Sequence, residues 1–125
     1  MLGTTSILNS TLKFGASVKR IVLTSSLAAV CEEDPTPREY DETSWNKAAI
    51  AAVASKGSAA GPVAIYSASK ILAERAAWKF VAEHKAELAW DLVVINPPWI
   101  FGVRRQSLHT MVLNPCRIAP RTAFS

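Results

Sequence analysis

The sequence places a tyrosine and a lysine four residues apart, as Tyr66 and Lys70. Both stand near the start of residues 64–88, a long helix-favouring segment, and positions i and i+4 share one face of a helix. An ammonium group beside a phenol favours the phenolate, so the pair indicates a tyrosine that can donate and accept a proton near neutral pH. The same spacing also arises by chance on solvated helix faces, so the pair needs support from other elements.

Two short apolar segments lie on either side of this helix. Residues 21–26 end in two serines, Ser25 and Ser26, and residues 92–95 are followed by Asn96 and two prolines. Both segments are continuously apolar or β-branched rather than alternating, which is typical of parallel strands buried on both faces. Strand, helical connection and strand together predict a βαβ unit.

Ligands of a doubly wound sheet bind beyond the carboxyl ends of its strands. We therefore expect a serine of the first strand to converge with Tyr66 and Lys70 on one crevice. The serine hydroxyl would hold a carbonyl oxygen, and the tyrosine would protonate that oxygen as negative charge develops on it. No side chain delivers a hydride, so the chemistry also requires a nicotinamide cofactor.

Two parallel strands do not make a stable doubly covered sheet by themselves. The predicted fold class is therefore α/β, as a piece of a doubly wound parallel sheet. The family resemblance given below implies that this piece is a partial Rossmann-like sheet, the C-terminal part of a cofactor-binding domain. Residues 1–102 are predicted to form this partial catalytic half. Residues 103–125 show no sustained periodicity and are predicted to form an irregular tail. A partner that completes the sheet is the alternative.

The composition is that of one globular domain, with 125 residues of which 50% are hydrophobic and 19% charged. The net charge of +4 comes from scattered residues, which argues against nucleic-acid binding. No apolar run reaches the roughly 18 residues of a membrane span. The two cysteines, Cys31 and Cys116, are not at a metal-binding spacing. We therefore expect a cytoplasmic protein with reduced thiols and with no membrane, nucleic-acid or metal partner.

The chain resembles the extended short-chain dehydrogenase/reductases, which belong to the NAD-dependent epimerase/dehydratase superfamily. Within them it is similar to the branch of dihydroflavonol reductases, cinnamoyl-CoA reductases and fungal aldehyde and ketone reductases. The resemblance rests on five segments in the family's order, namely the GTxxxL helix at 3–8, the serine strand at 18–30, the DE-x-x-W segment at 40–46, the YxxSK helix at 66–78 and the NP turn at 96–102.

This resemblance implies a role for each matched residue. Ser26 would be the catalytic serine, with Ser25 as the alternative because a one-residue shift of the alignment exchanges them. Tyr66 would be the general acid, and Lys70 its partner and a contact of the cofactor ribose. The implied cofactor is NADPH, or NADH, and its predicted contacts are Thr24, Ser25, Tyr66, Lys70, Pro97 and Ile100.

The implied activity is the reduction of an aldehyde or ketone, a small-molecule carbonyl substrate, by a Ser-Tyr-Lys mechanism. The family's GxxGxxG phosphate loop and N-terminal strands are missing, and residues 103–125 do not follow the family pattern. We therefore expect the chain to be inactive alone. Two other interpretations remain: a non-catalytic remnant or partner-completed module, and a sugar-nucleotide epimerase or dehydratase of the same superfamily. The oligomeric state is not predicted.

Overall fold

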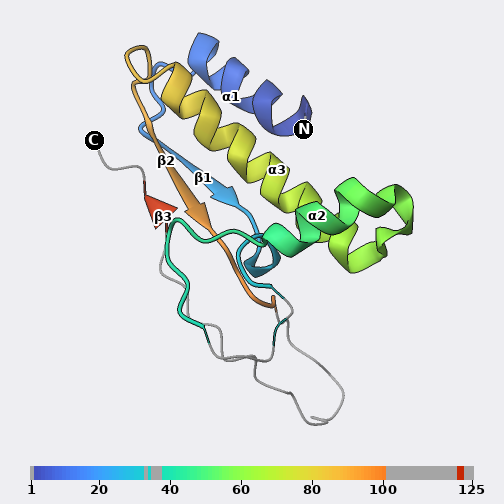
Figure 1. The fold of residues 1–125 in the computed structure, drawn as a ribbon. Coiled ribbons are helices and arrows are strands. Elements are labelled where there is room, and N and C mark those ends of the chain that lie inside the picture. Colours follow the sequence, from blue (N-terminus) through green and yellow to red (C-terminus); the bar gives the residue numbers. More distant parts are fainter. Residues whose placement is uncertain (1, 33, 35–37, 101–120, 123–125) are drawn as a thin grey trace, which may run out of the picture.

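The structure, a computed structural model, describes most of the chain (Figure 1), namely residues 2–32, 34, 38–100 and 121–122. Its elements in chain order are helix α1 (Leu2–Phe14), strand β1 (Arg20–Thr24), 3-10 helix η1 (Leu27–Ala29), helix α2 (Lys47–Lys56), 3-10 helix η2 (Gly57–Ala60), helix α3 (Pro62–Glu83), and strands β2 (Asp91–Ile95) and β3 (Arg121–Thr122). The two predicted strands and the long helix between them are confirmed, with slightly shifted bounds. The rest of the predicted tail, residues 103–120 and 123–125, lies outside the described residues.

β1 and β2 run parallel and pair over their whole length, from Arg20 opposite Asp91 to Thr24 opposite Ile95. The connection between them carries α3, so the predicted βαβ unit and the partial Rossmann-like α/β fold are confirmed. β3 adds a short antiparallel strand beside β2. β3 was not predicted, because a two-residue strand has no period to detect in the sequence.

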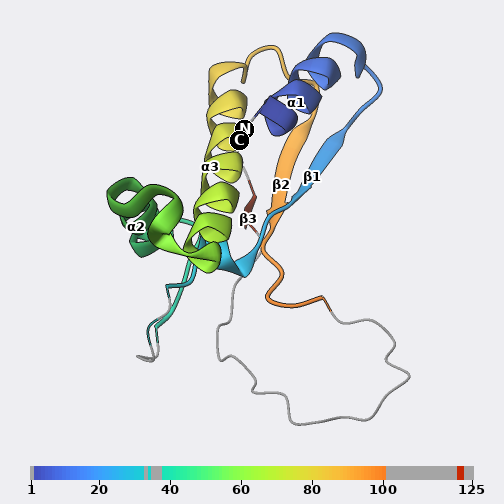
Figure 2. The same ribbon diagram turned by 90° about the vertical axis from the view of Figure 1, so that its right-hand side faces the viewer.

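Helices α1 and α3 lie side by side against one face of the β1–β2 pair, as the two views in Figures 1 and 2 show. α3 begins where Gly61, with φ +86°, turns the chain and Pro62 takes the first helical position, where a missing N–H costs no helical hydrogen bond. The apolar residues buried between the helices and the sheet are Leu8, Ala77, Phe80, Trp90, Leu92 and Val94. This cluster holds the helix that carries Tyr66 and Lys70 against the strands.

The opposite face of the sheet is open in the described part of the chain. Val22, in the middle of β1, is 55% exposed, whereas Ile21 and Leu23 on either side of it are half-buried. The prediction that both strands are buried on both faces is therefore wrong for β1. Alternating exposure is the pattern of a strand with one covered face, and no described element covers the other.

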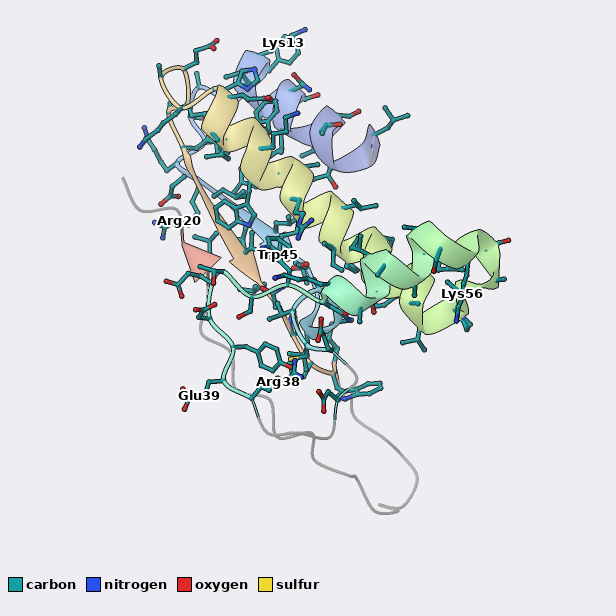
Figure 3. All side chains as sticks on the ribbon, in the orientation of Figure 1. Lys13, Arg20, Arg38, Glu39, Trp45 and Lys56 are labelled. Atoms are coloured by element: carbon teal, nitrogen blue, oxygen red, sulfur yellow. The ribbon has the colours of Figure 1, made fainter. Side chains whose placement is uncertain are left out.

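A second apolar cluster joins η1, α2 and α3, and its buried members are Ala29, Val30, Ala49 and Ile71. α2 begins at Asn46, whose side-chain oxygen accepts a hydrogen bond from Ala49 N at 3.0 Å. The guanidinium carbon of Arg75 lies 4.7 Å from the ring centre of Trp45, which is labelled in Figure 3, so this tryptophan packs on α3. Through this cluster, η1, which is capped by Ser26, packs against α3.

Cys31 is disulfide-bonded, so the expectation of a reduced thiol is wrong at this position. Spacing alone could not separate a free cysteine from a bonded one, and Cys116 lies outside the described residues. Of the helices in the described ranges, none is both long and apolar enough to cross a membrane. The same ranges hold no group of three or more side chains that could bind a metal ion.

Candidate active site

Helix α3 carries Tyr66 and Lys70 near its N-terminal end. Lys70 Nζ lies 5.8 Å from the centre of the Tyr66 ring, within the range of a cation–π contact, so the two side chains are neighbours as their spacing predicts. Tyr66 is 49% exposed and Lys70 is half-buried. The phenol therefore stands at the surface with a cation beside it, where a bound molecule can reach both.

The hydrogen-bond ladder between β1 and β2 continues beyond the two strands. Ser25 N donates to Ile95 O at 2.8 Å, and Leu27 N donates to Pro97 O at 3.0 Å. Pro97 itself has no N–H to donate, which ends the ladder. Ser26 lies between these two bonds, so its main chain is fixed at the carboxyl end of β1.

The two serines at this end of β1 have different surroundings. Ser26 is the cap of η1, and its Oγ accepts a hydrogen bond from Ala28 N at 3.2 Å. Its hydroxyl hydrogen can still be donated to an oxygen of a bound molecule. Ser25 Oγ is buried and has no hydrogen-bond partner among the described residues. These contacts favour Ser26 as the donor to a substrate and leave Ser25 as a hydroxyl that a ligand could satisfy.

The structure brings the elements of all three predicted catalytic residues into contact. α3, which carries Tyr66 and Lys70, packs on η1, which follows Ser26 directly. Ile71, next to Lys70 on the helix, is buried in one cluster with Ala29 of η1. No hydrogen bond within the described ranges joins the Tyr66 hydroxyl to either serine. Because such bonds commonly tighten only when substrate is bound, the catalytic roles stay a prediction.

Three of the predicted cofactor contacts lie at the carboxyl ends of β1 and β2. Thr24 and Ser25 lie at the end of β1, and Pro97 lies beside them after β2, whereas Ile100 is further along the chain and 84% exposed. The cofactor roles of these residues stay a prediction, and the sequence holds no GxxGxxG segment for the cofactor phosphates.

Two polar residues beside this site were assigned no role from the sequence. Glu74 is fully buried on α3, and Asn96 is the residue that follows β2. Asn96 Nδ2 donates to Ser26 O at 3.1 Å and to Glu74 Oε2 at 3.0 Å. One feature of the sequence could have indicated this contact: a glutamate stands two helical turns after Tyr66, among apolar positions of the helix. A glutamate buried at such a position needs a hydrogen-bond partner, because glutamate is rarely buried without one.

No family model matches the chain, but individual proteins do. The chain is 42% identical over 105 residues to a ketoreductase of Aspergillus niger, a match that covers 80% of this chain and 27% of that protein. It is 39% identical over 104 residues to the NADPH-dependent methylglyoxal reductase of Saccharomyces cerevisiae, covering 80% of this chain and 29% of the reductase. The crystal structure of the yeast methylglyoxal/isovaleraldehyde reductase complexed with NADPH matches with a TM-score of 0.68 and 37% identity, over 83% of this chain and 30% of that one.

The chain thus spans less than a third of the length of these relatives. Within the matched length, the yeast reductase is similar to this chain both in sequence and in fold. Three of the proteins that match are named as a ketoreductase, an NADPH-dependent methylglyoxal reductase and a cinnamoyl-CoA reductase. Over the matched part of its length, the chain resembles the extended short-chain dehydrogenase/reductases, in the branch that includes the fungal aldehyde and ketone reductases and the cinnamoyl-CoA reductases.

Proposed function

We propose that residues 1–102 are the catalytic half of a reductase that uses NADPH to reduce a small aldehyde or ketone, with Ser26, Tyr66 and Lys70 as its catalytic residues. The observation that carries this proposal is the Lys70 ammonium group beside the Tyr66 ring, on the helix that packs against η1. The names of the two fungal relatives, one of them called NADPH-dependent, support the cofactor and the class of substrate.

Each catalytic residue has its own task in this proposal. The Ser26 hydroxyl donates a hydrogen bond to the carbonyl oxygen of the substrate and fixes its position. The Tyr66 hydroxyl donates its proton to the same oxygen as negative charge develops there. The Lys70 ammonium stabilises the phenolate that remains and binds a ribose hydroxyl of the cofactor. NADPH, when bound, supplies the hydride that reduces the carbonyl carbon.

Thr24, Ser25, Pro97 and Ile100 are the proposed contacts of the nicotinamide end of the cofactor. The buried Ser25 hydroxyl supports this role, because binding would give it the partner that the described residues do not supply. NADH is the alternative cofactor, since the residues that choose between the two follow the second strand of such folds, which this chain does not contain.

The chain of 125 residues is proposed to have no turnover alone. One face of its sheet is open at Val22 in the described part of the chain, and the sequence holds no GxxGxxG motif for the cofactor phosphates. A cytoplasmic location is also part of the proposal, although a disulfide such as that of Cys31 is uncommon in a reducing compartment.

The test is a chimaera in which residues 3–100 replace the matching segment of the yeast methylglyoxal reductase, which supplies the rest of the fold. We expect the chimaera to oxidise NADPH in the presence of methylglyoxal, and Tyr66→Phe to lower kcat/KM by roughly 10²–10⁴-fold. Tyr40→Phe is the matched control, because Tyr40 packs against the second apolar cluster, that of Ala29, Val30, Ala49 and Ile71. A folded chimaera that keeps its rate after Tyr66→Phe would contradict the proposal.

A non-catalytic role is the second candidate, and the open sheet face favours it. Val22 and Ile95 are apolar and 55% and 38% exposed, so a partner protein could cover them. In that case the isolated chain would act by binding rather than by turnover. NADPH binding with micromolar Kd and turnover by the isolated chain would exclude this role, and titration of the purified chain with NADPH, followed by fluorescence, measures it.

A further inference from the structure

We propose that Glu74 and Asn96 form a hydrogen-bonded clamp that positions Ser26 relative to Tyr66 and Lys70. The inference rests on the function proposed above and extends it to two residues outside the catalytic set. Neither side chain is argued to touch the substrate or the cofactor. Their role is to hold the end of β1 at a fixed place on α3.

Tyr66, Lys70 and Glu74 follow one another at intervals of four residues on α3. An α-helix has 3.6 residues per turn, so each interval advances by about 40° around the helix axis. Exposure falls along the series, since Tyr66 is 49% exposed, Lys70 is half-buried and Glu74 is 0% exposed. The row therefore winds from the solvent into the protein, and Glu74 is the member that reaches the strands.

A buried carboxyl group is destabilising unless hydrogen-bond donors surround it. Glu74 Oε2 accepts from Asn96 Nδ2 at 3.0 Å, and Glu74 Oε1 accepts from Trp78 Nε1 at 3.4 Å. Trp78 belongs to the same helix, whereas Asn96 comes from the end of β2. The bond to Asn96 therefore ties α3 to the edge of the sheet where ligands are expected.

The side-chain amide of Asn96 has two N–H groups, and Nδ2 has two acceptors. Besides Glu74, it donates to the backbone carbonyl of Ser26 at 3.1 Å. One nitrogen atom thus connects residues that are 22 and 70 positions away in the sequence. The opposite orientation of the amide is unfavourable, because Asn96 Oδ1 would then face two acceptors. The bonds of the ladder on either side of Ser26 hold the rest of its main chain.

The clamp matters because Ser26 and Tyr66 must meet on a single substrate oxygen. Apolar packing of Ile71 near Ala29 keeps α3 and η1 in contact, but packing is not directional. Hydrogen bonds are directional, so the clamp can fix the orientation of the serine segment on the helix. A misplacement of about 1 Å at a reacting group can cost on the order of 10²-fold in rate.

The test measures kcat, KM and Tm of the chimaera with Asn96→Ala. We expect kcat to fall on the order of 10²-fold while KM for NADPH changes little. Asn46→Ala is the matched control. Asn46 also donates to a backbone carbonyl, that of Ala28 at 3.2 Å, but it is buried where Asn96 is half-buried, and it ties α2 rather than α3 to η1. It should lower Tm and leave kcat close to that of the parent.

A conservative variant provides a second measurement. Glu74→Gln keeps an oxygen that can accept from Asn96, so it should retain most of the kcat that Glu74→Ala loses. The comparison of Glu74→Gln with Glu74→Ala tests the clamp even if Asn96→Ala does not fold. A parent chimaera without Tyr66-dependent activity would overturn the proposed function and this inference together. An active parent in which Asn96→Ala lowers kcat no more than Asn46→Ala does, at equal loss of Tm, would overturn the clamp alone.

Discussion

Lys70 Nζ lies 5.8 Å from the centre of the Tyr66 ring, one turn further along α3. The ammonium group is thus placed over the ring and forms no hydrogen bond to the phenol oxygen in the structure. In the proposed reaction, Lys70 would stabilise the phenolate that forms when Tyr66 donates its proton. Its three N–H groups can then bind other acceptors, such as the hydroxyls of a ribose.

Lys70→Met should therefore weaken both catalysis and cofactor binding in the chimaera. Methionine keeps a long unbranched side chain but removes the charge and all three donors. We expect kcat/KM to fall by roughly 10²-fold, with a higher KM for NADPH, because the lysine is proposed to serve the tyrosine and the ribose together. Steady-state rates at varied NADPH and fixed aldehyde separate the two effects.

Lys79→Met is the control for this variant, because Lys79 lies on the same helix. Its side chain is 74% exposed and forms an i,i+4 pair with Glu83 at 3.6 Å, away from the strand ends. Its loss should leave kcat and KM unchanged. Equal effects of the two substitutions would show that the lysine at 70 acts only as a surface charge.

The sequence was sufficient to predict the two strands and the helix between them, because these elements depend on local patterns. The apolar segments 21–26 and 92–95 became β1 and β2, and the helix-favouring segment 64–88 contains most of α3, which begins two residues earlier at Pro62 and ends at Glu83. The exposure of Val22 was not predictable in the same way. A continuously apolar strand indicates a sheet that is covered on both faces. Whether a covering layer is present on each face depends on other segments.

For the site, the sequence predicted the neighbours that helical geometry enforces. Tyr66 and Lys70 are adjacent because residues at i and i+4 are always adjacent on a helix. The bonds of Asn96 to Glu74 and Ser26 join three separate elements, and no periodic pattern encodes such a contact. Only the packing of α3 on the strand ends reveals it.

Val22 and Val94 provide a matched test of the open sheet face. They lie on neighbouring strands, and Val22 is 55% exposed whereas Val94 is 0% exposed. Threonine has the shape of valine but adds a hydroxyl, whose burial without a partner costs about 1–3 kcal/mol. In the isolated chain, Val94→Thr should reduce helical circular dichroism, and Val22→Thr should not reduce it and should lower the binding of a hydrophobic dye.

The chimaera should reverse the result for Val22, because the remaining segments are proposed to cover the open face. There Val22→Thr should lower the midpoint of urea unfolding as Val94→Thr does. A Val22→Thr chimaera as stable as its parent would mean that the face stays open in the complete fold.

The pair Arg20 and Asp91 predicts a pH dependence of stability. Arg20 Nε donates to Asp91 Oδ1 at 2.8 Å, and this hydrogen bond, together with the charge of the guanidinium, lowers the pKa of Asp91 below its usual value. A carboxyl group whose pKa is lower in the folded state stabilises the fold above its unfolded pKa of about 3.9, and this stabilisation is lost as the pH falls through the folded value. Asp91→Asn should therefore lower the urea midpoint of the chimaera at neutral pH.

The difference between parent and Asp91→Asn should shrink as the pH falls below about 4 and as salt is added, because both side chains are largely exposed. Glu83→Gln, which removes the more distant surface pair with Lys79, is the control and should have a smaller effect at neutral pH. A difference for Asp91→Asn that grows on acidification would have the wrong sign for this explanation.

Alanine substitutions at Ser25 and Ser26 should separate the two serines by their kinetic effects. Ser26→Ala removes the proposed donor to the carbonyl oxygen, so kcat of the chimaera should fall by roughly 10²–10³-fold, the usual cost of losing one such donor. Ser25→Ala removes a buried hydroxyl without a partner, so Tm should stay the same or rise, while KM for NADPH increases because a cofactor contact is lost. A fall in kcat for Ser25→Ala with normal rates for Ser26→Ala would exchange the two roles, as a one-residue shift in the matched motif allows.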